Sequence, residues 1–262
     1  MPEIYLTHID TACVLLEIDG FRILTDPTLD AAGGCYYHGF GAISRKTNSA
    51  PPIGLLPEDI DLVLLTHHQH MDNFDVVGRE FTSNCRLVIS TTSAAKAIPK
   101  VKGLENWESL EVRTQKLNGL KITATPAQHR PWWIPEWVSG KVIGFIIEFE
   151  GQQDGVIYIS GDTVYFKGIE EVGRRYRVDI GIFHVGSVQF RYLTGFGKYT
   201  MDGSDLLKVI RVLVPRLAIP VHFDGWSHFQ EREPHLRKVL SLNPAINKLI
   251  TFLKNGERTK IK

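Results

Sequence analysis

The sequence has few cysteines, almost no net charge and no long apolar run. Its 3 cysteines are scattered and none forms a CxxC pair, which excludes a disulfide framework and favours reduced thiols in an intracellular protein. Its 30 Lys and Arg residues balance 29 Asp and Glu residues to a net charge of +1, so a polybasic surface for nucleic acid is not expected. Its apolar stretches are strand-sized and fall far short of the roughly 20 residues that a membrane span needs, so we expect no stable insertion into a membrane.

The N-terminus and the composition extend these exclusions. The first residues contain neither a basic n-region nor an apolar h-region, so we expect no secretory signal and a cytoplasmic protein. With 262 residues, 43% of them hydrophobic, the chain can bury a full core, and no linker or repeat divides it. We therefore expect one domain over residues 1–262, while assembly into a homo-oligomer stays open. The one surplus is histidine, with 10 residues, several of them in short clusters.

Short strands with interspersed helices dominate the pattern, which indicates an α/β protein. Asp19-Gly20 separates two β-branched runs and predicts a hairpin turn. Residues 61–66 are apolar on both faces, as expected of a central strand between covered layers. Residues 201–214 combine an apolar helical face with an N-cap, Asp202 or Ser204. The expected strands are residues 4–8, 12–17, 21–25, 61–66, 86–90, 120–125, 142–148 and 156–160, and the expected helices are residues 73–81, 93–98, 168–175, 201–214 and 230–240.

A long segment without predicted strands or helices covers residues 30–57 and is rich in Gly, Pro, Ser and aromatic residues. A loop of this length inside a domain is usually functional, as a lid for example, or mobile. Tyr36, Tyr37, His38 and Phe40 within it could close over a substrate. The cations Arg45 and Lys46 either contact an anionic group or lie solvated on the surface.

The densest group of metal-ligand side chains is in residues 66–73, Thr-His-His-Gln-His-Met-Asp-Asn. His68, His70 and Asp72 follow a buried strand at i, i+2 and i+4 and can converge on one point. Neutral imidazole is a good ligand for zinc-like ions, and a carboxylate can complete the site or bind a second metal. The same spacing selects His68 over the adjacent His67, which we assign to packing or to a hydrogen bond with a ligand.

This motif resembles the HxHxDH motif of the metallo-β-lactamase superfamily, and the resemblance covers nearly the whole chain. Residues 124–129, 158–163 and 219–222 are similar to the segments that carry its third histidine, its bridging aspartate and its last histidine. The opening, residues 6–27, resembles the lactonase-like branch, which includes L-ascorbate-6-phosphate lactonase and is similar to the N-acyl-phosphatidylethanolamine phospholipase D group. The resemblance implies a four-layer αββα sandwich with a metal site at one edge, between two sheets.

The resemblance also implies the ligands and the metal. The first site would comprise His68, His70 and His129, the second Asp72 and His222, with Asp162 bridging the two. The sequence departs from the motif at Asn73, where a histidine is usual, and an amide oxygen is a poorer ligand for zinc than imidazole. Whether one or two metals bind therefore stays open, with Zn²⁺ expected and Mn²⁺ or Fe²⁺ as alternatives.

Five other side chains have two interpretations each. Asp26 is either a turn former or a carboxylate that orients a ligand histidine. His184 either lines the pocket and protonates a leaving group or is a buried structural histidine, and His8 is similarly a pocket or a core residue. Trp132 and Trp133 either wall an apolar substrate pocket or serve core packing or a dimer contact.

The implied reaction is metal-dependent hydrolysis. A metal with a free position lowers the pKa of bound water towards about 7, and the resulting hydroxide is a nucleophile at neutral pH. The sequence has no GxSxG motif, and no separate nucleophile is needed. We expect a hydrolase that acts on a lactone, ester or phosphodiester of a small molecule, with Asp72 and His184 as catalytic residues. A mononuclear-iron oxidoreductase and a non-catalytic metal- or ligand-binding protein of the same fold are the alternatives.

Overall fold

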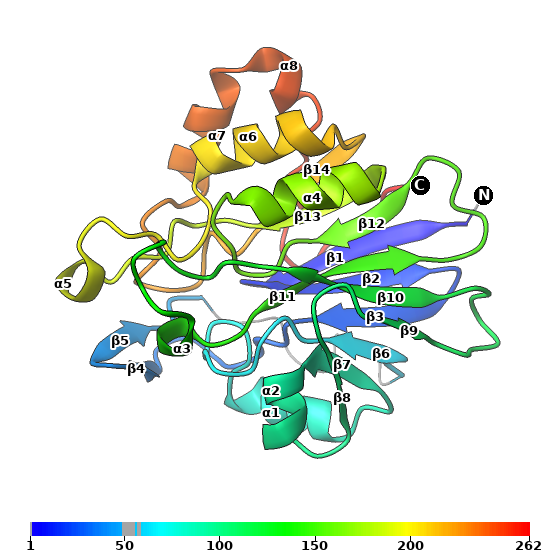
Figure 1. Cartoon of the computed structure of the whole chain (residues 1–262), viewed down its shortest axis with the longest axis horizontal. Coiled ribbons are helices and arrows are strands. Elements are labelled where there is room, and N and C mark those ends of the chain that lie inside the picture. Colours follow the sequence, from blue (N-terminus) through cyan, green and yellow to red (C-terminus); the bar gives the residue numbers. More distant parts are fainter. Residues whose placement is uncertain (1, 49–55, 57–58) are drawn as a thin grey trace.

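The apolar, β-branched runs of the sequence form two β-sheets that pack face to face (Figure 1). The computed structural model describes residues 2–48, 56 and 59–262. The first sheet has seven strands in the order β15-β1-β2-β3-β6-β7-β8. These are β1 (Ile4–Asp10), β2 (Cys13–Ile18), β3 (Phe21–Thr25), β6 (Leu62–Leu64), β7 (Val88–Thr91), β8 (Val101–Leu104) and β15 (Thr259–Lys260).

The second sheet has six strands in the order β14-β13-β12-β11-β10-β9. Strands β12, β13 and β14 are parallel to one another, and β11 is antiparallel to both β10 and β12. Consequently β10, β12, β13 and β14 all end at the same edge. The six are β9 (Ser109–Glu111), β10 (Lys121–Pro126), β11 (Ile143–Glu148), β12 (Val156–Ile159), β13 (Val178–His184) and β14 (Leu217–Val221).

Helices cover the outer face of each sheet, giving four layers (Figure 1). Strand β2 shows why. Val14 and Leu16 face the apolar layer between the sheets, whereas Cys13 and Leu15 face the layer under α1 and α2. A third apolar layer lies between the second sheet and its helices. This arrangement confirms the predicted αββα sandwich. The covering helices are α1 (Val76–Ser83), α2 (Thr92–Ala97), α4 (Lys167–Arg175), α6 (Gly203–Leu213), α7 (Glu233–Ser241) and α8 (Pro244–Asn247).

Local sequence signals explain several boundaries. Asp19 and Gly20 both have positive φ, 46° and 82°, as a type I′ hairpin turn requires, so this predicted turn is confirmed. Helix α6 begins after Asp202, whose side chain accepts a hydrogen bond from the backbone N–H of Asp205 at 2.9 Å. The apolar face of α6, which includes Leu206 and Ile210, packs on the second sheet.

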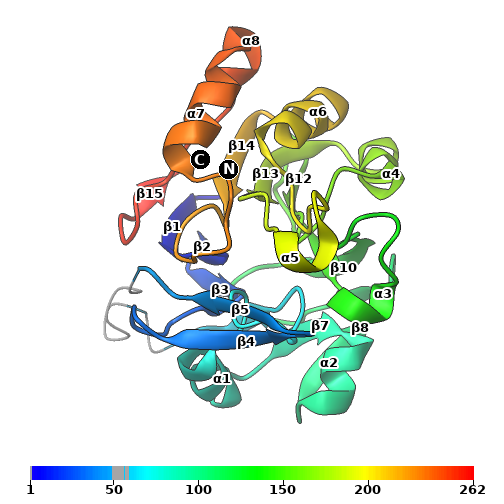
Figure 2. The same ribbon diagram turned by 90° about the vertical axis from the view of Figure 1, so that its left-hand side faces the viewer.

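Residues 35–45, expected to lie within a loop, instead form a β-hairpin of β4 (Cys35–Gly39) and β5 (Ala42–Arg45). The C-terminal end of the 30–57 segment, residues 49–55 and 57–58, lies outside the described residues. Two short helices, α3 (Glu136–Ser139) and α5 (Arg191–Thr194), lie on the same side of the molecule as the hairpin (Figure 2).

A buried ion cluster anchors the hairpin to the body. Nζ of Lys46 lies 2.8 Å from Oδ2 of Asp10 and 3.2 Å from Oδ2 of Asp75, and none of these side chains is more than 1% exposed. Asp75 also caps α1 by accepting a hydrogen bond from the N–H of Gly78. Lys46 was expected to contact an anionic group of a substrate or to lie solvated on the surface. This expectation is corrected, because its partners are buried carboxylates of the protein itself.

Candidate metal centre

Six segments with ligand-type side chains meet at the edge of the sandwich where strands of both sheets end. The first sheet contributes the segment after β6, which holds His67, His70 and Asp72. The second contributes the segments after β10, β12 and β14, which hold His129, Asp162 and His222, respectively. The ends of β3 and β13 supply Asp26 and His184. Parallel strand ends therefore gather residues that are far apart in sequence.

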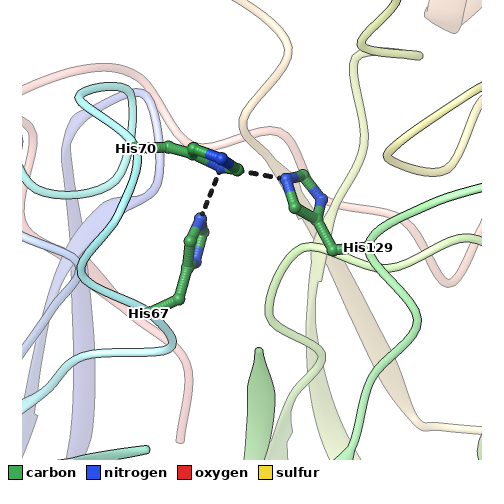
Figure 3. A group of neighbouring side chains, drawn as sticks. All are labelled: His67, His70 and His129. Atoms are coloured by element: carbon green, nitrogen blue, oxygen red, sulfur yellow. Dashed lines mark hydrogen bonds between the residues drawn. The ribbon is translucent and has the colours of Figure 1, made fainter. Parts of the chain in front are cut away.

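Three imidazole rings form the first cluster (Figure 3). Nδ1 of His70 lies 3.1 Å from Nε2 of His67 and 3.1 Å from Nε2 of His129. Ligand atoms that share a tetrahedral ion at about 2.0–2.1 Å stand a little over 3 Å apart. The three nitrogens therefore have the spacing of donors to one metal ion.

Hydrogen bonds behind the rings determine which nitrogen faces inward. The Thr66 hydroxyl donates to Oδ1 of Asp26 at 2.9 Å, so its oxygen accepts from Nδ1–H of His67 at 3.1 Å. Nδ1–H of His129 donates to the carbonyl of Tyr199 at 2.9 Å. Nε2 of both rings is therefore unprotonated in the neutral form, as a metal ligand must be. Burial supports this state because it lowers the pKa of both histidines.

Two carboxylates and one imidazole form the second cluster. Nε2 of His222 lies 3.6 Å from Oδ2 of Asp72 and 3.6 Å from Oδ2 of Asp162. The three side chains are buried, and His222 has an unusual positive φ of 62°. This strained backbone turns the ring toward the two aspartates at the strand end.

Unpaired buried atoms show that the second cluster fits a cation. Within the described part of the chain, Oδ1 of Asp72, Oδ2 of Asp162 and Nε2 of His222 have no hydrogen-bond partner. Leaving such atoms unpaired in the interior is costly. Burial lowers the pKa of His222, but the charges of Asp162 and Asp72 outweigh burial and raise it to about 9. The cluster thus attracts positive charge, and a divalent metal supplies it with the ligand types present.

The chain is similar in sequence to a family of known proteins. Residues 21–223 match the β-lactamase superfamily domain. The chain belongs to the metallo-β-lactamase superfamily. A UPF0173 metal-dependent hydrolase of Caldivirga maquilingensis is 24% identical over 256 residues, which are 97% of this chain and 96% of that protein. Another, from Thermoplasma acidophilum, is 28% identical over 179 residues, 68% of this chain and 72% of the relative.

Solved structures share the metallo-β-lactamase fold. A possible metal-dependent hydrolase from Veillonella parvula superposes with a TM-score of 0.81 at 22% identity and covers 98% of this chain and 99% of its own. An isothiocyanate hydrolase from Delia radicum gut bacteria superposes with a TM-score of 0.78 at 23% identity, covering 97% of this chain and 98% of its own. At these identities the likeness shows the fold.

The structure favours another register for the superfamily motif in this chain. His67, which we had assigned to packing or to a hydrogen bond with a ligand, is in the first cluster, and His68 is in neither cluster. The i, i+2, i+4 spacing assumed an extended backbone, but the chain bends at residues 68 and 69. The bend lies between His67 and His70, whose ring nitrogens Nε2 and Nδ1 lie 3.1 Å apart. The carbonyl of His68 accepts a hydrogen bond from Arg79 instead.

Asn73 occupies the position of the motif's second-site histidine and acts as a hydrogen-bond donor. Its Nδ2 donates to Oδ1 of Asp162 at 3.4 Å. The amide is thus positioned to orient Asp162, and the side chain is completely buried. Its Oδ1 has no hydrogen-bond partner among the described residues, so the expectation that Asn73 is a supporting residue or a weak ligand stays a prediction.

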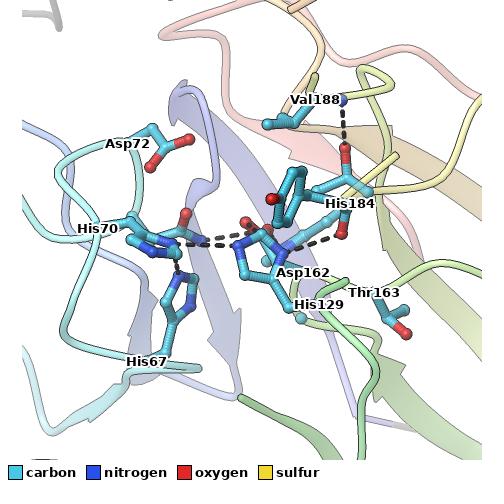
Figure 4. Close-up of polar contacts among 12 residues, drawn as sticks. His67, His70, Asp72, His129, Asp162, Thr163, His184 and Val188 are labelled. Carbon is cyan, nitrogen blue, oxygen red and sulfur yellow. Dashed lines mark hydrogen bonds and ion pairs between the residues drawn. The ribbon is translucent and has the colours of Figure 1, made fainter. Parts of the chain in front are cut away.

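His184 contacts Asp162 (Figure 4), and Asp26 contacts Thr66. Nδ1 of His184 lies 3.0 Å from Oδ1 of Asp162, and Oδ1 of Asp26 accepts from the backbone N–H of Thr66 at 2.7 Å. Both side chains are completely buried, and His184 is not among the described residues that line the adjacent pocket. This placement favours the alternative of a buried histidine that orients Asp162, and the role of proton donor to a leaving group stays a prediction.

Two further histidines flank Asp72: His38, from the segment predicted to close over a substrate, and His228, which the sequence pattern missed. Nε2–H of His228 donates to Oδ2 of Asp72 at 2.9 Å, and Nδ1 of His38 lies 3.7 Å from Oδ1. The His228 ring stacks on Phe190 with centroids 5.0 Å apart. No pattern in the sequence linked either histidine to Asp72, because both are far from the motif. Both lie in short segments with several aromatic residues.

A pocket of about 40 Å³ opens onto both clusters. His70, Asp72 and His129 form part of its lining, and apolar side chains such as Val188 and Phe190 form much of the rest. No lysine or arginine is among the described residues that line it. The pocket therefore favours an uncharged, apolar ligand beside the candidate metal positions.

His38 and Phe40, predicted to close over a substrate, line this pocket, whereas the other five side chains predicted for it do not. His8 is buried in β1, where Nε2 lies 3.0 Å from the carbonyl of Thr11. Tyr36 donates its hydroxyl proton to Asp30 at 2.7 Å. The other three, Tyr37, Trp132 and Trp133, are exposed at the surface.

Proposed function

We propose that this metal-dependent hydrolase cleaves a small, uncharged, largely apolar ester or lactone. One observation carries the proposal: six ligand-type side chains converge at one end of a pocket that lacks cationic side chains among its described residues. Superfamily membership and the names of the relatives support hydrolysis. The substrate follows from the chemistry of the pocket walls.

The proposed metal is Zn²⁺, held by His67, His70 and His129, with a second ion at Asp72, Asp162 and His222. When bound, a divalent metal makes a water nucleophilic at neutral pH and polarises the attacked carbonyl. The imidazole-rich first position suits zinc, whereas the carboxylate-rich second position also accepts Mn²⁺ or Fe²⁺.

The protein contributes orientation and exclusion of water. Asp26, through Thr66, holds the ring of His67 in the ligating tautomer, and His184 holds Asp162. The walls formed by Val188 and Phe190 desolvate the substrate carbonyl, which strengthens its interaction with the site.

The absence of lysine and arginine among the described lining residues disfavours a phosphodiester or a sugar phosphate. Such substrates carry a charge, which proteins commonly bind with arginine or lysine. Arg45 and Lys46 do not line the pocket, and Lys46 is committed to buried carboxylates. A neutral acyl group remains the best match.

The test is turnover by protein reconstituted with Zn²⁺, Mn²⁺ or Fe²⁺ after chelation. The panel is p-nitrophenyl acetate, a chromogenic lactone, bis(p-nitrophenyl) phosphate and benzyl isothiocyanate. We expect the neutral esters and lactones to be hydrolysed, and His70→Ala to reduce kcat/KM at least 100-fold. His235→Ala, which removes an exposed histidine of α7, is the matched control and should retain activity.

Four outcomes would refute the proposal. Full turnover after complete metal removal would exclude the metal mechanism. Preference for the phosphodiester would exclude the proposed substrate. No turnover by a fully metallated protein would favour a binding protein, and oxygen consumption with iron would favour an oxidoreductase.

A further inference from the structure

Exposed apolar side chains are concentrated around the pocket mouth. Of the 12 large hydrophobic side chains that are exposed in the described part of the chain, nine come from three segments: the β4–β5 hairpin, residues 132–137 and residues 192–196. The exposed fraction reaches 91% for Phe196 and 81% for Trp132. These nine form what we call the aromatic rim: Tyr37, Phe40, Ile43, Trp132, Trp133, Trp137, Tyr192, Leu193 and Phe196.

The three segments are attached to one another. The Tyr192 hydroxyl accepts from the N–H of Ile43 at 3.1 Å and donates to the carbonyl of Gly41 at 3.0 Å, which ties α5 to the hairpin. Phe40 contacts Trp137 edge to face, with ring centroids 5.7 Å apart. Figure 2 shows the hairpin, α3 and α5 on the same face of the molecule.

A close contact joins the second and third of these segments. Gly197, directly after the rim residues of the third segment, packs so tightly on Pro131 that a Cβ atom there would collide with its ring. Only glycine fits this position. The rim is thus a connected structure rather than three separate loop tips.

The rim is continuous with the pocket. Phe40 and Leu193 belong to both, and Val138, next to Trp137, also lines the pocket. An apolar path therefore leads from the candidate metal positions to the surface. Exposed apolar area of this extent is costly in water unless a ligand covers it.

We propose that the aromatic rim binds an unbranched hydrocarbon chain of the substrate, whose carbonyl lies at the metal centre. This inference rests on the proposed function and assigns the substrate class: a medium- or long-chain acyl ester, or a lactone with an alkyl tail. The acyl chain follows the path past Phe40 and Leu193 and lies against Trp137. Each buried methylene adds to binding because apolar area leaves water.

The first experiment compares p-nitrophenyl esters from acetate to decanoate, all below their micellar concentrations. We expect kcat/KM of the metal-loaded protein to rise at least tenfold from butyrate to decanoate. Trp137→Ser and Leu193→Ser should lower kcat/KM for decanoate five- to tenfold more than that for acetate. Val214→Ser and Leu242→Ser, which remove exposed apolar side chains outside the rim, are the matched controls and should change neither.

A second measurement separates the rim from the reaction. Calorimetric binding of acetohydroxamate and decanohydroxamate holds the metal-binding head constant and varies only the chain. We expect decanohydroxamate to bind at least tenfold more tightly, with the difference lost in Trp137→Ser. Chain-dependent binding without ester turnover would support the rim and refute the proposed reaction.

Other results would overturn the inference itself. Ester turnover or hydroxamate binding that does not depend on chain length would show that the rim binds no hydrocarbon chain. Rim substitutions that convert a dimer to a monomer in light scattering, or abolish binding to phosphatidylcholine vesicles, without altering chain-length dependence, would assign the rim to a second copy or to a lipid surface.

Discussion

Replacing Lys46 by methionine should destabilise the protein strongly, since Lys46 is the cation of a buried cluster. Its Nζ lies 2.8 Å from Oδ2 of Asp10 and 3.2 Å from Oδ2 of Asp75, and these side chains are at most 1% exposed. Methionine retains the packing volume but leaves two carboxylates without a counter-ion. Breaking a buried ion pair from one side typically costs about 3–5 kcal/mol.

The pH dependence of this loss provides a second signature. Burial already raises the pKa of Asp10, although the Lys46 charge opposes the shift. Without Lys46, the folded variant should retain a carboxyl proton that the unfolded chain releases near pH 4. Because the folded state then binds more protons, its stability falls as the pH rises, by up to about 1.4 kcal/mol per pH unit.

Urea unfolding at pH 5.5 and 7.5 tests both effects. Buried Trp226, whose ring centroid lies 5.6 Å from Nζ of Lys46, supplies the fluorescence signal. Lys116→Met is the matched control, because Lys116 pairs with Asp61 at the surface and such pairs contribute about 0–1 kcal/mol. A loss of less than 1 kcal/mol in Lys46→Met, or a loss that is independent of pH, would refute the reasoning.

Three further predictions concern the metal centre and α6. Thr66→Val removes the hydroxyl that orients His67, so metal affinity in chelator competition should fall about 10–100-fold; unchanged affinity would contradict the assigned tautomer. His228→Ala removes the donor to Asp72, and elemental analysis should show metal content falling toward one equivalent, whereas two full equivalents would count against its role. Asp202→Asn keeps the helix cap but removes a charge. Burial disfavours that charge, but a lysine hydrogen bond lowers the pKa below its usual value. Urea unfolding should therefore show a loss of up to about 1 kcal/mol at pH 7 that shrinks below about pH 4, where the unfolded chain takes up a proton, and disappears below the lowered pKa of the folded state; a difference as large at pH 3 as at pH 7 would exclude the charge effect.

The layered fold was predictable because the residues on both faces of its strands are apolar. In β2, for example, Val14 and Leu15 face different layers, and both layers consist of buried apolar side chains. The β4–β5 hairpin was not predictable in this way. Its strands lie at the surface and pack on no extensive apolar layer, so their composition resembles that of a loop.

The candidate ligands were predictable where strand ends position them. His129, Asp162 and His222 each follow a strand of the second sheet, and the structure brings them to the same edge. The choice between His67 and His68 depended on a bend in the backbone that periodicity does not encode. The role of His228 depends on a tertiary contact with Asp72, which lies 156 residues away in the sequence.

Each candidate metal position draws its donors from both sheets. His67 and His70 face His129 across the gap, and Asp72 faces Asp162 and His222. A bound ion would therefore cross-link the two halves of the sandwich at their open edge, where the hydrophobic layer ends. By thermodynamic linkage, an ion at 100 times its Kd adds about 2.7 kcal/mol to the free energy of unfolding. The availability of metal would then affect the lifetime of the folded protein as well as its rate of hydrolysis.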